Sequence, residues 1–83
     1  MPVIHRLGPY QFFFYSDENR EAREPPHIHV RSGGRVVAFW LSPVSLRESR
    51  GYTPREIERI RRIVMSRREM FLRRWHEYFD HLA

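Results

Sequence analysis

The chain changes its hydrophobic pattern once, at Thr53-Pro54-Arg55-Glu56, and this change most constrains its fold. Thr53 suits the cap of a helix N-terminus, Pro54 suits the first helical position, and Glu56 completes a capping box. Beyond this point apolar residues recur at intervals of three, four and seven, as on one face of a helix. These residues are Ile57, Ile60, Val64, Phe71, Trp75, Tyr78 and Leu82. The pattern predicts one long C-terminal helix over residues 53–82.

Residues 1–50 instead have the features of short strands. Apolar runs rich in strand-favouring residues cover residues 3–7, 10–15, 27–31 and 35–41. Turns separate two pairs of these runs, at Gly8-Pro9 and at Ser32-Gly33-Gly34. Residues 16–24 are polar and are predicted to form a mobile loop, while residues 44–46 form a short fifth strand or a turn. We therefore predict a single α+β domain over residues 1–83, with a small antiparallel sheet of about four strands packed against the long helix.

The basic residues are all arginine. The 83 residues include 15 arginines, no lysine and 10 acidic residues, which gives a formal net charge of +5. Because arginine pairs bidentately with phosphate or carboxylate, this composition favours RNA, DNA or an acidic partner protein. The alternatives are a GC-rich genome, which favours arginine codons, and a solvated helix face. The candidate nucleic-acid-binding residues are Arg31, Arg35, Arg55, Arg59 and Arg62.

His27 and His29 form the one constellation that suggests chemistry. Pro25 and Pro26 stiffen the chain before them, and side chains alternate along a strand, so both imidazoles are predicted on one side. Three interpretations compete. The pair could act in acid–base catalysis with Arg31 and Arg35 as phosphate clamps. It could bind a divalent metal, or it could be structural. A metal needs further ligands, for which the candidates are His5, Glu24, His76 and Glu77.

Several classes of site and location are not expected. The chain has no cysteine, so it has neither disulfides nor a thiolate zinc site. Apart from a divalent metal at His27 and His29, no cofactor is suggested. The sequence lacks a signal-peptide pattern and any run near the roughly 18 apolar residues of a transmembrane helix, so we expect a cytoplasmic protein without membrane contact. One helix leaves one face of the sheet uncovered, and we therefore expect a homodimer or a partner protein.

The order of four motifs resembles a small bacterial family. The motifs are residues 10–16, Glu24-Pro25-Pro26-His27-Ile28-His29-Val30, Ala38-Phe39-Trp40-Leu41 and Trp75-His76-Glu77-Tyr78-Phe79. The family is the domain-of-unknown-function family four-one-six-zero, and the positions that match its motif are Pro26, His27, His29, Trp40 and Trp75. The resemblance implies a short, cytoplasmic, prokaryotic protein, often encoded beside another small protein in an arrangement like a toxin–antitoxin pair. The family has no established activity.

Three hypotheses follow from these observations. The first is a component of a toxin–antitoxin-like pair that binds nucleic acid or its antitoxin-like partner protein. The second is a metal-dependent or histidine-based hydrolase or nuclease centred on His27 and His29. The third is a protein-interaction module without catalysis.

Overall fold

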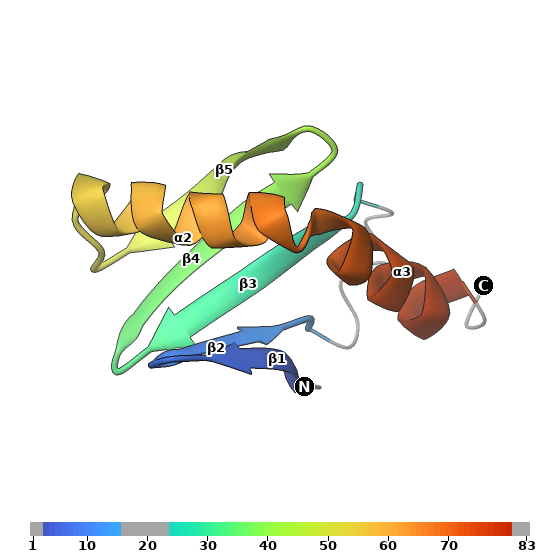
Figure 1. Cartoon of the computed structure of the whole chain (residues 1–83), viewed down its shortest axis with the longest axis horizontal. Helices are drawn as coiled ribbons and strands as arrows, with labels where there is room; N and C mark the ends of the chain where they lie inside the picture. The colour runs from blue at the N-terminus through green and yellow to red at the C-terminus, as the bar shows by residue number, and fades with distance from the viewer. Residues whose placement is uncertain (1–2, 16–23, 81–83) are drawn as a thin grey trace.

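The structure, a computed structural model, describes residues 3–15 and 24–80. Within these ranges the elements follow one another as strands and then helices (Figure 1): β1 (Val3–Leu7), β2 (Tyr10–Phe13), β3 (His27–Ser32), β4 (Arg35–Leu41), β5 (Val44–Arg50), α2 (Pro54–Ser66) and α3 (Arg68–Phe79). The predicted α+β class is confirmed. The sheet has five strands rather than about four, because the short run expected at residues 44–46 extends to Arg50. The predicted loop lies almost wholly outside the described residues.

The five strands form an antiparallel sheet in the order β1-β2-β3-β4-β5, so each strand pairs with its neighbour in the chain. Both helices lie on one face of this sheet (Figure 1), and α2 packs across β4 and β5. Among the described residues no helix covers the opposite face, which we call the helix-free face. No helix in these ranges is long and apolar enough to span a membrane.

The core lies between the sheet and the two helices. Alternate residues of the central strands point toward the helices, and the predicted apolar stripe of the helices meets them. Fully or almost fully buried residues in this core include Phe12, Phe14, Ile28, Val30, Val37, Phe39, Leu41, Ile60, Val64, Phe71 and Trp75. Ile57 and Tyr78 pack against this core and are partly buried, and Leu82 lies outside the described residues. The solvent-facing side of the helices carries exposed charged residues, which include Arg55, Arg59, Arg62, Glu69, Arg73 and Glu77.

The C-terminal helical segment is not one helix. It breaks at Arg67, whose backbone has φ −115° and ψ 16°. Contacts with the sheet hold this junction: Arg67 Nε donates to His5 Nε2 over 3.1 Å, and Arg68 Nε donates to the Leu41 carbonyl over 2.6 Å. The local sequence is compatible with a continuous helix, so tertiary contacts decide the break.

The predicted start of α2 is confirmed. The backbone N–H of Glu56 donates to Thr53 Oγ1 over 3.2 Å, which satisfies one of the free donors at the helix N-terminus. The Glu56 carboxylate forms an ion pair with Arg35 of β4, at a distance of 3.1 Å. The cap therefore fixes the start of α2, and the ion pair joins α2 to the sheet.

Gly51 connects β5 to α2 in a conformation that alanine resists. Its φ is +95°, and a Cβ at this position would lie 2.8 Å from Arg35 Cγ. We expect Gly51→Ala to lower the free energy of unfolding by about 1–2 kcal/mol, measured by urea denaturation. Gly34→Ala is the matched control, because a Cβ there meets nothing within 4 Å. Equal losses in both variants would contradict the explanation.

Candidate functional site

His27 and His29 lie on the same side of β3, as the alternation of side chains predicts. Their ring centroids are 5.3 Å apart. Between and beyond them, Ile28 and Val30 are fully buried in the core on the other side. The two imidazoles are therefore neighbours on a rigid strand.

His27 is enclosed by protein. It has no exposed surface, and its ring centroid lies 5.0 Å from that of Trp75 and 5.4 Å from that of Trp40. Its Nδ1 donates to the Pro25 carbonyl over 2.9 Å. His27 begins β3, where the sheet meets α3. These contacts are those of a packed residue, and they favour the structural interpretation for His27.

The further ligands suggested for a metal lie in other contacts. His5 accepts a hydrogen bond from Arg67, and Glu24 pairs with Arg47 at 3.1 Å. His76 Nδ1 lies 3.1 Å from Asp80, and Glu77 pairs with Arg74 at 3.6 Å. Over residues 3–15 and 24–80, no group of three or more histidines and carboxylates is placed to hold a metal ion.

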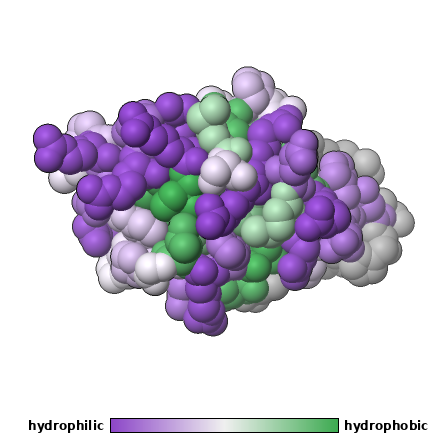
Figure 2. All heavy atoms as spheres, viewed as in Figure 1, coloured by the Kyte–Doolittle hydropathy of each residue, from purple (hydrophilic) through white to green (hydrophobic). Residues whose placement is uncertain are grey.

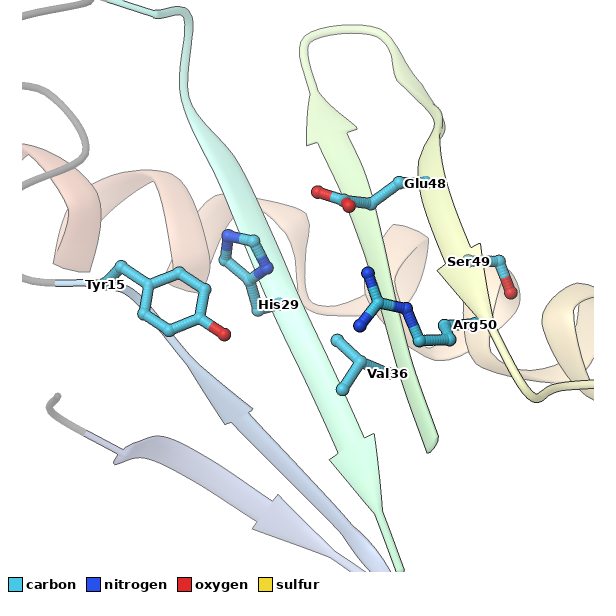
Figure 3. A pocket seen from close by; sticks show the side chains of 6 residues that line it. All are labelled: Tyr15, His29, Val36, Glu48, Ser49 and Arg50. Carbon is cyan, nitrogen blue, oxygen red and sulfur yellow. The ribbon is translucent and has the colours of Figure 1, made fainter. Parts of the chain in front are cut away.

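His29 borders a small pocket of about 140 Å³ on the helix-free face (Figure 3). Its ring stacks on Phe13 with centroids 5.5 Å apart and meets the edge of Tyr15 at 4.5 Å. Glu48 and Arg50 extend from β5 over the same face, while the helices lie behind the sheet. The residues that line the pocket are Tyr15, His29, Val36, Glu48, Ser49 and Arg50.

Glu48 and Arg50 were missed by sequence reasoning for a physical reason. The β4–β5 turn pairs Leu41 with Val44, and an unbroken register would place Arg47 opposite Ala38. The register instead shifts between Ala38 and Phe39, so Glu48 lies opposite Ala38. An irregularity of this kind exchanges the faces of all later side chains. No feature of the sequence marks this shift.

The structure does not bring Arg31 and Arg35 together. Arg31 Nε donates to Gln11 Oε1 over 2.9 Å, and its guanidinium lies 4.8 Å from the centre of the Phe13 ring on the helix-free face. Arg35 is opposite Ser32 in the register of β3 and β4, so both side chains lie on the face of the sheet that carries the helices. There Arg35 pairs with Glu56 of α2. Arg35 therefore lies on the other side of the sheet from the histidine pair.

Three of the predicted arginines do converge. They lie at intervals of four and three on the outer face of α2, and all are exposed. They line a shallow groove, which we call the α2 groove, formed by Arg55, Glu58, Arg59, Arg62 and Ile63. Figure 2 shows hydrophilic side chains gathered over the N-terminal half of α2. Among the described residues, neither Arg55 nor Arg59 forms an ion pair, so their guanidinium groups remain available to a ligand.

Glu58 is the one acidic side chain in this groove. A hydrogen bond from Arg61 lowers the pKa of the Glu58 carboxyl below its ordinary value. Arg62 lies 3.5 Å from the same carboxylate. Since Arg61 already pairs with Glu58, the groove keeps a positive balance.

Comparison with known proteins gives one family. A family model described as "Domain of unknown function (DUF4160)" matches residues 10–76, which is well over half of the chain. The matched range includes the pocket and the α2 groove. No match was found among curated proteins or among solved structures.

Proposed function

The chain belongs to the family of the domain of unknown function DUF4160, and within that family we propose that it binds nucleic acid through the α2 groove. The observation that carries this proposal is the row of exposed guanidinium groups at Arg55, Arg59 and Arg62. Guanidinium groups bind phosphate oxygens bidentately, and a helix holds them in a fixed row.

The dimensions of the row fit a phosphate backbone. Arg55 and Arg62 are seven residues apart, which corresponds to about 10 Å along a helix. This length matches about three nucleotides of one B-form strand at 3.4 Å each. The net charge of +5 adds long-range attraction to any polyanion. Contacts to phosphates alone give affinity without sequence preference.

The test is the salt dependence of binding by the triple variant Arg55→Gln/Arg59→Gln/Arg62→Gln. Fluorescence anisotropy with a short single-stranded RNA and a DNA duplex measures affinity at several NaCl concentrations. We expect the affinity of this variant at low salt to be about 10–100-fold lower than that of the native chain. We also expect the slope of log K against log [NaCl] to decrease in magnitude by about 2–3, because each of three lost phosphate contacts contributes about 0.7–0.9.

A variant with the same charge change elsewhere separates the groove from net charge. Arg6→Gln/Arg73→Gln/Arg74→Gln removes three exposed arginines outside the groove, and we expect it to keep most of the affinity. Equal losses in both variants, or no binding by the native chain at low salt, would refute the proposal.

A second candidate function is protein binding along β5. This strand is last in the sheet order, and its outer edge pairs with no strand of the described residues. Leu46, on the same strand, is 49% exposed. An extended segment of a partner can add a strand to such an edge. This arrangement suits the toxin–antitoxin-like pair that the family resemblance implies, with the product of an adjacent small gene as partner.

Co-expression with that adjacent gene product tests the second candidate. Leu46→Lys places a charge on the edge, which discourages strand pairing, and should weaken co-purification of the partner at least tenfold. Leu46→Ala is the control. Undiminished co-purification with the lysine variant would count against the edge. Light scattering of the purified chain tests the homodimer directly.

The histidine-based or metal-dependent hydrolase has less support. His27 is fully enclosed, and the described residues assemble no third metal ligand beside the pair. His29 borders the pocket on the helix-free face. Binding without catalysis is therefore the function that we propose.

A further inference from the structure

The pocket on the helix-free face presents both signs of charge to one small space, and we infer that it binds a guanine base. Glu48 and Arg50 supply the charged groups, and Tyr15, Val36 and His29 supply the walls (Figure 3). This inference goes beyond the proposed function, because the pocket and the α2 groove lie on opposite sides of the sheet and either can fail alone.

The charges select a neutral ligand with polar edges. Glu48 and Arg50 are two residues apart on β5, so their side chains leave the same face about 6–7 Å from each other along the strand. The carboxylate repels a simple anion, and the guanidinium repels a simple cation. A neutral group that offers donors to Glu48 and acceptors to Arg50 satisfies both.

Neighbouring contacts hold the carboxylate in place. Arg47 hydrogen-bonds Glu48 and also pairs with Glu24 at 3.1 Å, while its guanidinium lies 5.3 Å from the centre of a Trp40 ring. Among the described residues Arg50 forms no ion pair. Glu48 is therefore a positioned acceptor, and Arg50 is available to a ligand.

The walls and the volume select a flat ring. Tyr15 lines the pocket with its ring centroid 4.5 Å from that of His29, so the two rings form an aromatic wall against which a flat base can lie. His29 is 3% exposed and is held against Phe13, so its ring is a fixed surface. A volume of about 140 Å³ suits one ring system rather than a peptide segment.

Guanine matches both charged groups. Its N1–H and N2–H₂ groups are adjacent donors for one carboxylate, and its O6 and N7 atoms are adjacent acceptors for one guanidinium. Adenine has no such donor pair, and cytosine lacks the O6/N7 pair. The base could belong to a free guanine nucleotide or to guanosine in a strand, and the recognition chemistry is the same.

Titration calorimetry on the full chain tests the inference with guanosine, adenosine, cytidine and inorganic phosphate as separate probes. We expect guanosine to bind at least about tenfold more tightly than adenosine or cytidine, the usual range for a bidentate contact. Phosphate alone should not compete. Glu48→Gln and Arg50→Gln should each weaken guanosine binding about tenfold or more. Both side chains are exposed, so both variants should fold.

Glu69→Gln and Arg6→Gln are charge-matched controls at exposed positions outside the pocket. Equal affinity for guanosine and adenosine, binding of phosphate without nucleoside selectivity, or no nucleoside binding at millimolar concentration would each overturn the inference. Guanosine monophosphate and a guanine-containing strand, compared with a guanine-free strand, then identify the source. A preference for either guanine-containing ligand supports the base site. Loss of strand binding in the groove variant, with guanosine binding kept, would separate the two sites.

Discussion

Replacing Trp75 with alanine should remove a large share of the stability of the fold. Trp75 is 2% exposed, and its ring lies 4.2 Å from Phe79, 5.2 Å from Phe14 and 5.0 Å from His27 between ring centroids. Truncation of a buried tryptophan costs about 3–5 kcal/mol. A domain of this size has a total stability of roughly 4–12 kcal/mol, at 0.05–0.15 kcal/mol per residue. The loss is therefore a large share of the total, and α3 should detach first from the sheet.

Urea denaturation followed by far-ultraviolet circular dichroism measures this effect, and the midpoint should fall by at least about 1.5 M. Leu46→Ala is the control, because Leu46 is 49% exposed and should change stability by less than about 0.5 kcal/mol. If Trp75→Ala lost no more than this control, α3 would not be anchored as the structure indicates.

The fold was predictable where local signals agree with tertiary packing. The strand at Val3–Leu7 and the strand at Arg35–Leu41 begin and end where the apolar runs do. Thr53 and Pro54 fix the start of α2 through a hydrogen bond and a backbone angle, both of which are local properties. The alternation in β3 predicted that His27 and His29 are neighbours. These features depend on few distant contacts.

Features that depend on distant contacts were not predictable. The helix break at Arg67 follows from two hydrogen bonds to the sheet. Arg67 donates to His5, which lies 62 positions earlier in the chain, and Arg68 donates to the carbonyl of Leu41, which lies 27 positions earlier. The full length of β5 could not be predicted, because an edge strand carries charged residues on its exposed sides. These charges interrupt the apolar run by which a strand is recognised in a sequence. The sequence therefore indicated a helix and a sheet but not where the helical segment bends.

Part of the site could have been found from turn geometry. Gly33-Gly34 is a two-residue turn, which pairs Ser32 with Arg35. Pairing partners share a face, so Arg35 had to follow Ser32 away from the histidines. The groove arginines were predictable because helical spacing alone places them in a row. The pocket was not, because the irregularity in β5 decides which charged residues face it.

His27→Ala should destabilise the protein by about 2–4 kcal/mol, since it leaves a cavity and removes the hydrogen bond to the Pro25 carbonyl. His29 borders a pocket that water can enter. We therefore expect His29→Ala to destabilise the protein less than His27→Ala does, with a difference of at least about 1 kcal/mol. Urea denaturation of both variants measures the difference. His27→Phe keeps a ring but not the hydrogen bond, and His27→Asn keeps a donor but not the ring.

These variants decide whether His27 has a role beyond packing. A structural His27 predicts that nucleic-acid affinity and guanosine affinity follow the folded fraction in His27→Phe and His27→Asn, and that both affinities are native in the folded molecules. His29→Gln should weaken guanosine binding while leaving most of the protein folded, because His29 forms a wall of the pocket. A His27→Ala variant as stable as the native chain, yet defective in binding, would instead make His27 part of the site.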